Sequence, residues 1–336
     1  MRFCQGQTAL ICEKPLIMPW KMHLFLLGLA ALCLSALSTT KTKATPSLRY
    51  LDTGQETRLL ADPDGITADT TFAIASVGKT MTAVAILRRV AQGTLRLDDP
   101  VSDWVNADIT NGLGGLDDIT LRHLLTMTSG LPDYYTDTYL QDVLDDPSLQ
   151  SPEIALSYAF DEEVTFDPGS DFDYSNTNYV LLGMILEKAT GLTYAQALQR
   201  DVFTPARMTN SFVFGSQTLP TSFATAPDTV RGYYEGAGFG DGGVISTGRD
   251  VAQFYRALFL DQTLLPSDLL ADMTTDPIGK GYSMGIELDG DVVGHSGGDL
   301  GFSSDVRLHL STGSIAVMLV AEEDADTVWT DDQMPD

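Results

Sequence analysis

Cysteine and histidine are both scarce in this sequence. Its three cysteines are Cys4, Cys12 and Cys33, so the long remainder of the chain contains none. Without thiols, that remainder cannot use disulfides, thiol catalysis or cysteine-ligated metals. Only four histidines occur, and none forms an H-E-x-x-H pattern, which argues against a metal site. We therefore expect a protein that works with neither a metal nor a cofactor.

Basic residues are also few, because 20 lysines and arginines stand against 46 aspartates and glutamates, a formal charge of −26. Such a chain repels polyanions, which excludes nucleic acid as a partner and disfavours anionic membrane surfaces. The acidic residues are scattered rather than gathered in blocks, which indicates a heavily solvated surface.

Long hydrophobic runs are absent except near the start of the chain. Met22 to Ser38 reads MHLFLLGLAALCLSALS, follows Lys14 and Lys21, and ends in a small-x-small pattern. These features predict a secretory signal peptide over residues 1–38, with an apolar core too short to span a bilayer comfortably. The mature protein would be secreted or periplasmic, free of cysteine and without a stable membrane anchor. A buried helix or an uncleaved anchor is the alternative interpretation.

The apolar pattern changes twice along the chain. Two short runs between Leu48 and Leu60 predict a β-hairpin, and helical spacing dominates residues 96–235. Antiparallel strands are predicted at residues 282–288, 292–294, 303–310 and 315–320. We therefore expect an α+β protein, an antiparallel sheet flanked by helices with an inserted helical lobe. The sheet lobe would comprise residues 39–95 and 236–321, the helical lobe 96–235, and an acidic tail 322–336.

Ser76 and Lys79 stand three residues apart where a strongly helical stretch begins. Side chains at i and i+3 share one face of a helix, so the lysine amine can reach the serine hydroxyl. Serine is a weak nucleophile until a base removes its proton. A lysine half-buried at the head of an apolar helix can be that base, because burial disfavours its charged form. Unpaired N–H groups at the helix start, including that of Ser76, can receive a developing oxyanion.

A serine cap followed by a solvated lysine is the purely structural interpretation of the same pair. The helix expected at Lys79–Gln92 argues against it, since this stretch is apolar nearly all round until Arg88 and Arg89. That composition indicates a central helix whose head lies inside the molecule. An unpaired lysine there would be costly, so the pair is a candidate catalytic site.

A second polar motif, Tyr174-Ser175-Asn176, follows a turn-rich stretch. Tyr174 could relay a proton if nearby cations favoured its ionised form. The amide of Asn176 could hold a substrate carbonyl and the Lys79 amine. A loop tripeptide with a helix cap is the structural alternative for this motif on its own.

A third motif, Gly294-His295-Ser296-Gly297-Gly298, matches the G-x-S-x-G pattern of the nucleophile elbow in α/β-hydrolases. That elbow needs a helix directly after the serine, followed later by an acid and a histidine. An alternating strand is expected here instead, and the last histidine, His309, lies on it. We therefore reject Ser296 as the nucleophile.

A glycine-rich stretch, Gly238-x-Gly240-x-x-Gly243, matches a dinucleotide-binding fingerprint. It lacks both the preceding strand of a βαβ unit and the downstream acidic residue. We interpret it as a flexible loop at the rim of the site.

Taken in order, Ser76-x-x-Lys79, Tyr174-Ser175-Asn176 and His295-Ser296-Gly297 resemble the three motifs of the penicillin-recognising serine hydrolases. The Tyr-x-Asn form is similar to that of the class C β-lactamase branch, which includes D-alanyl-D-alanine carboxypeptidases and esterases. Phrases at residues 119–131, 242–247 and 281–285 match as well, and the resemblance covers roughly residues 48–321. It implies an antiparallel sheet beside a helical lobe, with the site in the cleft between them.

The resemblance also implies roles for the motif residues. Ser76 would be acylated, and Lys79 and Tyr174 would shuttle its proton. The backbone N–H groups of Ser76 and Gly298 would form the oxyanion hole, and Asn176 would orient the substrate.

His295, Ser296 and Gly297 would line the strand along which an acyl donor or its carboxylate lies. The β-lactamases usually have lysine where this chain has His295, which favours the carboxypeptidase or esterase side of the branch. Histidine has a reference pKa near 6.5. If its charged form holds a substrate carboxylate, we expect carboxypeptidase activity to weaken as the pH rises through that value.

These expectations combine into a secreted serine hydrolase that acts through an acyl-enzyme on Ser76. The function expected is a D-alanyl-D-alanine carboxypeptidase-like peptidase or a β-lactamase-related hydrolase, acting on a small peptide, an ester or a β-lactam. A carboxylesterase of the same fold and a catalytically impaired binding relative are the alternatives. An interaction domain, in which the serine, lysine and tyrosine are incidental, is a third.

Overall fold

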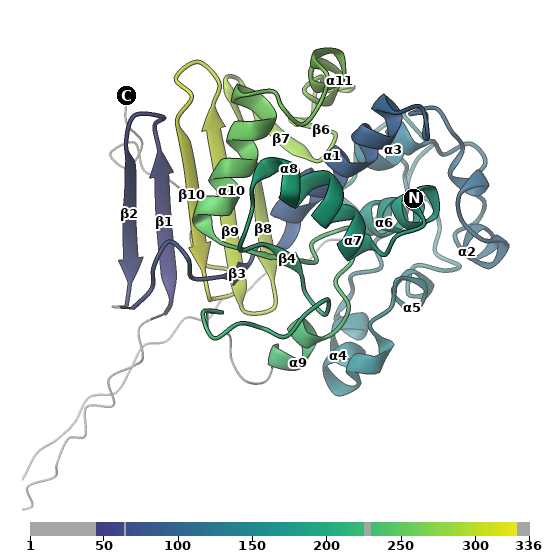
Figure 1. The fold of residues 1–336 in the computed structure, drawn as a ribbon. Coiled ribbons are helices and arrows are strands. Elements are labelled where there is room, and N and C mark those ends of the chain that lie inside the picture. The colour runs from purple at the N-terminus through teal and green to yellow at the C-terminus, as the bar shows by residue number, and fades with distance from the viewer. Residues whose placement is uncertain (1–44, 64, 225–229, 328–336) are drawn as a thin grey trace, which may run out of the picture. The chain divides into compact units, whose positions relative to one another are not determined.

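The computed structural model describes residues 45–63, 65–224 and 230–327 (Figure 1). Chain contacts divide the protein into Met1–Thr42 and Lys43–Asp336, and every described residue belongs to the second unit. The predicted signal peptide and all three cysteines lie outside the described residues. None of the helices in these ranges is long and apolar enough to cross a membrane.

A seven-stranded antiparallel sheet is the framework of this unit, with the strand order β2-β1-β10-β9-β8-β7-β6 (Figure 1). The strands along it are β2 (Thr57–Asp62), β1 (Ser47–Asp52), β10 (Ile315–Val320), β9 (Phe302–His309), β8 (Val292–Asp299), β7 (Ile286–Asp289) and β6 (Tyr282–Ser283). The predicted hairpin is β1 and β2, and the last strand pairs with the first.

One face of the sheet carries the apolar core. Val317 of β10 lies opposite Val306 of β9, and Ile315 lies opposite Leu308; all four side chains are fully buried. Because side chains alternate along a strand, these residues point to one face. Helix α10 (Gly248–Tyr255) packs against β1, β9 and β10.

Helix α1 (Gly78–Ala91) is the buried helix that the sequence predicts. A 3₁₀ turn at Ala75–Val77 leads into it, and every residue from Gly78 to Leu87 is buried. The helix ends where Gly93 adopts a φ of 72°, the left-handed conformation that glycine tolerates best. Only its last turn differs from expectation, because Ala91 is exposed while Arg89 is buried and pairs with Asp201 at 2.8 Å.

Shorter elements complete the unit. A second sheet has the order β3-β5-β4, made of β3 (Phe72–Ala73), β5 (Val244–Ser246) and β4 (Phe212–Val213). The remaining α-helices are α2 (Ala107–Gly112), α3 (Leu121–Leu125), α4 (Asp137–Asp145), α5 (Pro152–Ser157), α6 (Asn176–Thr190), α7 (Tyr194–Leu198), α8 (Thr204–Ala206), α9 (Arg231–Glu235) and α11 (Ser267–Met273). The α+β fold class is confirmed.

One strand boundary differs from prediction for a local reason, and the start of the acidic tail is anchored to the sheet. The run at residues 282–288 is two strands, β6 and β7, because Gly285 turns the chain with a φ of 74°. A side chain there would also lie 2.9 Å from the Lys79 carbonyl, so glycine lets this turn approach α1. The acidic tail is anchored at its start, since Ser303 Oγ donates to the Glu322 carbonyl at 2.8 Å and accepts from Ala325 N–H at 3.0 Å.

Candidate active site

Ser76 lies in the 3₁₀ turn that precedes α1, and its side chain is partly exposed. The residue before it, Ala75, has a φ of 46°, a conformation that residues other than glycine seldom adopt. Strained backbone of this kind persists where surrounding structure enforces it, often at functional sites. The turn is held from two sides, because Gly242 would contact Ala75 and Gly297 would contact Ser76 N if either carried a side chain.

Lys79 is fully buried, and its ammonium group has three acceptors. Its Nζ donates to Ser76 Oγ at 2.9 Å and to Asn176 Oδ1 at 2.7 Å. The third hydrogen bond goes to the carbonyl oxygen of Asp241 at 2.5 Å. An ammonium group has three N–H donors, so each is matched. Ser76 from the turn before α1, Lys79 from α1 and Asn176 from α6 are thus brought together.

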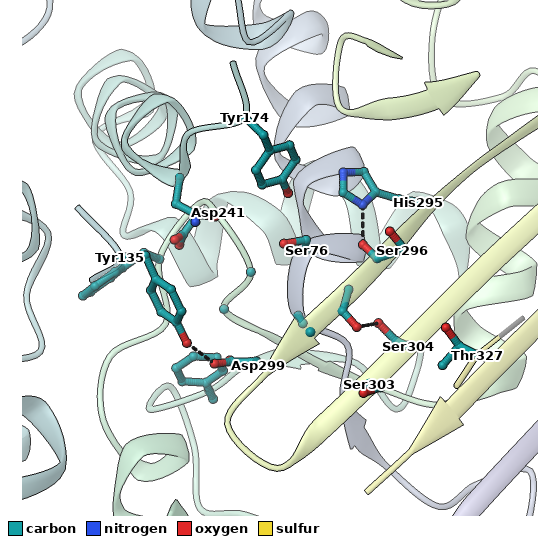
Figure 2. A pocket seen from close by; sticks show the side chains of 18 of the residues that line it. Ser76, Tyr135, Tyr174, Asp241, His295, Ser296, Asp299, Ser303, Ser304 and Thr327 are labelled. Atoms are coloured by element: carbon teal, nitrogen blue, oxygen red, sulfur yellow. Dashed lines mark hydrogen bonds between the residues drawn. The ribbon is translucent and has the colours of Figure 1, made fainter. Parts of the chain in front are cut away.

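Tyr174 completes this cluster from the other side. Its ring centroid lies 5.1 Å from Lys79 Nζ and 6.3 Å from the His295 ring. In Figure 2 its hydroxyl points toward Ser76. That hydroxyl is buried and has no hydrogen-bond partner within the described part of the chain. A group so placed can exchange a proton with the serine or with a leaving group.

Asp133 fixes the orientation of Asn176, and the sequence reasoning missed it. Its carboxylate accepts hydrogen bonds from Asn176 N–H at 3.0 Å and from Asn176 Nδ2 at 2.9 Å. Because Nδ2 is held there, Oδ1 is left to face Lys79. Burial raises the pKa of Asp133, although a hydrogen bond from Tyr135 N–H and the charge of Lys79 oppose that rise. A turn-forming Pro132-Asp133 pair was the only signal in the sequence.

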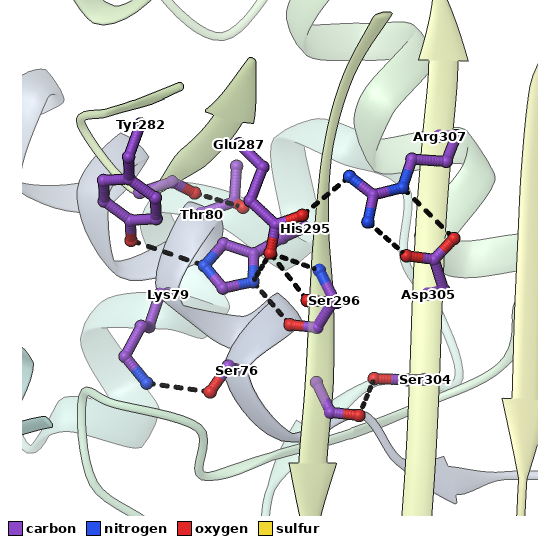
Figure 3. Close-up of polar contacts among 12 residues, drawn as sticks. Ser76, Lys79, Thr80, Tyr282, Glu287, His295, Ser296, Ser304, Asp305 and Arg307 are labelled. Carbon is purple, nitrogen blue, oxygen red and sulfur yellow. Dashed lines mark hydrogen bonds and ion pairs between the residues drawn. The ribbon is translucent and has the colours of Figure 1, made fainter. Parts of the chain in front are cut away.

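His295 lines the pocket but is almost fully covered, with 1% of its surface exposed. Its Nε2 lies 3.3 Å from the Tyr282 hydroxyl and its Nδ1 lies 2.5 Å from the Ser296 carbonyl (Figure 3). Burial lowers the pKa of His295 to about 4, despite the opposing charge of Glu287. The expectation that His295 titrates near 6.5 is therefore wrong, because burial keeps the imidazole neutral at neutral pH.

Ser296 belongs to a charged network on the other face of β8 (Figure 3). Its hydroxyl donates to Glu287 Oε1 at 2.6 Å, and Glu287 Oε2 accepts from Arg307 at 2.7 Å. Burial acts to raise the pKa of Glu287, but the charges of His295 and Arg307 and hydrogen bonds from Ser296 outweigh it and lower the value to about 2. The chain after Ser296 continues as strand β8, so it is not the elbow of an α/β-hydrolase.

Gly297 and Gly298 bring the backbone of β8 against the Ser76 turn. A Cβ on Gly297 would lie 3.0 Å from Ser76 N and 2.6 Å from Ser304 Oγ, so this strand approaches closely only with glycine. Gly298 is exposed, and a Cβ there would meet no atom within 4 Å. An incoming carbonyl therefore has open access to the backbone at Gly298, beside that of Ser76.

The glycine-rich loop is a packed wall of the site, which corrects the expectation of a flexible rim. A Cβ on Gly240 would lie 2.1 Å from the Tyr179 carbonyl, and one on Gly243 would lie 2.5 Å from Gly238. Next to them, Asp241 accepts from the Tyr134 hydroxyl at 2.7 Å while its carbonyl binds Lys79. Gly240 thus permits close packing against α6, and Gly238 and Gly243 permit close packing against each other. No nucleotide-binding βαβ unit surrounds them in the described chain.

These residues surround a pocket of about 510 Å³ (Figure 2). Its described lining includes four acidic residues, Asp241, Glu287, Asp299 and Asp324, and neither lysine nor arginine. Burial raises the pKa of Asp299 to about 6, and burial also raises the pKa of Asp241. In the part of the chain that the structure describes, no three carboxylate or imidazole groups converge as a metal site would require.

The sheet, the buried lysine beside a partly exposed serine, and the pocket together define a serine hydrolase fold of the Ser-x-x-Lys type. The Beta-lactamase family model matches residues 46–332. The chain therefore belongs to the Beta-lactamase family, which confirms the resemblance seen in the sequence.

Comparison with individual proteins gives the same placement. The chain is 28% identical over 284 residues to penicillin-binding protein 4* of Bacillus subtilis, covering 75% of this chain and 61% of that relative. The chain thus spans less than two thirds of that relative's length. A D-stereospecific amidohydrolase from Streptomyces sp. has a TM-score of 0.71 at 27% identity, with 83% of this chain and 89% of that one covered. A penicillin-binding protein from Bacillus halodurans has a TM-score of 0.71 at 26% identity, with coverage of 83% and 91%.

Proposed function

We propose that this protein hydrolyses an amide or ester through an acyl-enzyme on Ser76. The observation that carries the proposal is the 2.9 Å contact between Lys79 Nζ and Ser76 Oγ at the edge of the pocket. A lysine with a matched set of acceptors is held in place before any substrate arrives. Such pre-organisation is what a base that must reach a serine hydroxyl requires.

In this mechanism Lys79 acts as the neutral amine: its two N–H groups bind Asn176 Oδ1 and the Asp241 carbonyl, and its lone pair faces the Ser76 hydroxyl, which then donates to it. The Ser76 oxygen attacks the substrate carbonyl carbon, and its proton passes to the Lys79–Tyr174 pair. The carbonyl electron pair moves onto oxygen, where the N–H groups of Ser76 and Gly298 would receive the charge. Collapse of this intermediate expels the amine or alcohol, which takes the proton from Tyr174. Water then attacks the acyl-enzyme by the reverse route, releasing the acid and restoring the serine.

The charges at the His295 end of the pocket favour leaving groups without a carboxylate. The imidazole is neutral there, and the carboxylate of Glu287 remains ionised beside Ser296. No lysine or arginine among the described lining residues could pair with a substrate carboxylate. Of the functions that the sequence allows, we therefore favour an amidohydrolase or esterase over a D-alanyl-D-alanine carboxypeptidase or a β-lactamase. The similarity to a D-stereospecific amidohydrolase supports this choice.

Replacement of the nucleophile tests the function directly. We expect Ser76→Ala to abolish labelling by a fluorophosphonate and to lower turnover of p-nitrophenyl butyrate by about a thousandfold or more. Ser296→Ala, the matched control, should retain labelling, because its hydroxyl bonds to Glu287 and not to Lys79. Loss of labelling in a folded Ser296→Ala protein, with labelling retained in Ser76→Ala, would overturn the proposal.

We also propose that the protein is exported, on the strength of the basic and apolar pattern within residues 1–38. Mass spectrometry of the secreted product should show a chain that begins near Thr39 and does not react with thiol reagents. A mature product that still contains Cys33 would contradict this.

A further inference from the structure

The pocket has a second polar end, on the side of Ser76 away from His295. Figure 2 shows Asp299 and Tyr135 there, joined by a hydrogen bond. The Tyr135 hydroxyl donates to Asp299 Oδ1 at 2.6 Å, and Leu300 N–H donates to the same oxygen at 2.8 Å. Tyr233 also lines the pocket, and burial together with the nearby charge of Asp299 raises its pKa, which places its ring at this end. A carboxylate among aromatic rings is the arrangement with which proteins bind organic cations.

The charge at this end is not neutralised by a basic side chain of the pocket lining. Burial raises the pKa of Asp299 to about 6, the charge of Asp241 adds to that rise, and Lys79 opposes it. Lys79 directs its hydrogen bonds to Ser76, Asn176 and the Asp241 carbonyl instead. At neutral pH the end therefore presents an ionised carboxylate to whatever enters the pocket.

The position of this carboxylate along β8 sets which part of a substrate it meets. Asp299 directly follows Gly298, whose N–H group would hold the oxyanion. One residue of a strand advances by about 3.3 Å, so the carboxylate lies within a few bond lengths of the bound carbonyl. Tyr174, which would protonate the leaving group, lies at the His295 end of the pocket, so the acyl part of the substrate extends toward Asp299. A substituent on that acyl part, close to the scissile carbonyl, is the group that can reach Asp299.

Resting on the acyl-enzyme function proposed above, we propose that Asp299, with Tyr135 and Tyr233, binds a protonated amine on the acyl part of the substrate. The substrate class is then amides and esters of amino acids whose amine is unblocked. Glu287 at the opposite end disfavours an anionic leaving group, so the pocket selects a cationic acyl group and an uncharged leaving group.

The test compares two substrates that differ only in the charge on the amine. D-alanine p-nitroanilide carries an ammonium group, and N-acetyl-D-alanine p-nitroanilide does not; the L-enantiomers are measured alongside. We expect kcat/KM of the full-length protein to be at least about tenfold higher for the free amine. The ratio of kcat/KM for the free-amine substrate to kcat/KM for the acetylated substrate should rise as the pH rises through about 6, where Asp299 ionises. It should fall near pH 8, where the substrate amine loses its proton.

Asp299→Asn removes the charge but keeps an oxygen to accept from Tyr135 and Leu300. We expect it to bring the ratio close to one and to flatten its rise near pH 6. Asp289→Asn, at the exposed end of β7 and outside the pocket lining, removes the same charge and should leave the ratio unchanged. To provide a readout independent of turnover, binding of D-phenylalaninamide to Ser76→Ala protein is measured by calorimetry and should weaken at least about tenfold with Asp299→Asn.

Failure of the subsite and failure of the proposed function are distinguishable. If Ser76 is labelled by a fluorophosphonate but neither substrate pair nor calorimetry shows a preference for the amine, the ammonium subsite is wrong and the hydrolase stands. An amine preference that survives in Asp299→Asn also overturns it. If no labelling or ester hydrolysis occurs in a folded protein, the hydrolase proposal fails, and the subsite proposal that rests on it fails as well.

Discussion

Substitution of Asp133 tests whether a residue that never touches the nucleophile positions the catalytic cluster. In Asp133→Asn one carboxylate oxygen becomes an NH₂ group facing the Nδ2 of Asn176. Two donors cannot bond, so we expect the Asn176 amide to turn over and present its NH₂ to Lys79. The 2.7 Å hydrogen bond from Lys79 to Asn176 is then lost, while the turned Oδ1 accepts from the new NH₂ group at position 133.

The size of the effect follows from the lost hydrogen bond to Lys79. A hydrogen bond to a charged group contributes about 1.5 kcal/mol at the low end, so its loss raises the barrier by about that amount. That corresponds to a fall in kcat of about tenfold or more. The assay is kcat and KM for p-nitrophenyl butyrate, with Asp137→Asn as the control, because Asp137 lies exposed at the start of α4. Thermal midpoints of each variant separate lost activity from lost folding.

A double-mutant cycle gives the decisive result. If Asp133 acts through Asn176, then Asp133→Asn should cost almost nothing further in an Asn176→Ala background. Losses in kcat that multiply across the two substitutions would refute the reasoning and show that Asp133 contributes by another route.

Two further predictions concern stability. Burial lowers the pKa of His295 to about 4 from 6.5, so the unfolded state binds its proton first as the pH falls. About 3 kcal/mol of unfolding free energy is therefore lost between pH 6.5 and 4. Urea unfolding across that range should show a steeper loss of stability in wild type than in His295→Gln. Parallel plots of unfolding free energy against pH for the two proteins would contradict this prediction. Gly240→Ala would place a Cβ 2.1 Å from the Tyr179 carbonyl and should lower the unfolding free energy by about 2 kcal/mol or more. Gly298→Ala meets nothing within 4 Å and is the control, so equal thermal midpoints for the two variants would refute the packing argument.

Local chemistry was the part of the site that the sequence could predict. The contact between Ser76 and Lys79 needs only one turn of helix, so spacing and an apolar helix were enough to anticipate it. The orientation of Asn176 depends on Asp133, which lies 43 residues away along the chain. Nothing in a linear pattern states which way a side-chain amide will point.

Burial by distant segments explains the other differences. The pKa of His295 depends on how completely the side chain is covered, and Tyr282 comes from another strand. The glycines near Gly240 carry no sign in the sequence that α6 would pack against them. The turn at Gly285 likewise looked like the middle of one strand, because the flanking residues on both sides are apolar.

The pairing of β1 with β10 has a consequence for how the chain folds. Ser47 pairs with Val320, and β10 lies between the hairpin and β9, so the N-terminal hairpin has no neighbour in the sheet until the last strand has been synthesised. Contacts between residues so far apart in the chain form slowly, because a long loop must close first. During synthesis the inner edge of the hairpin therefore stays unpaired until β10 is available, and completion of the sheet is a late folding event.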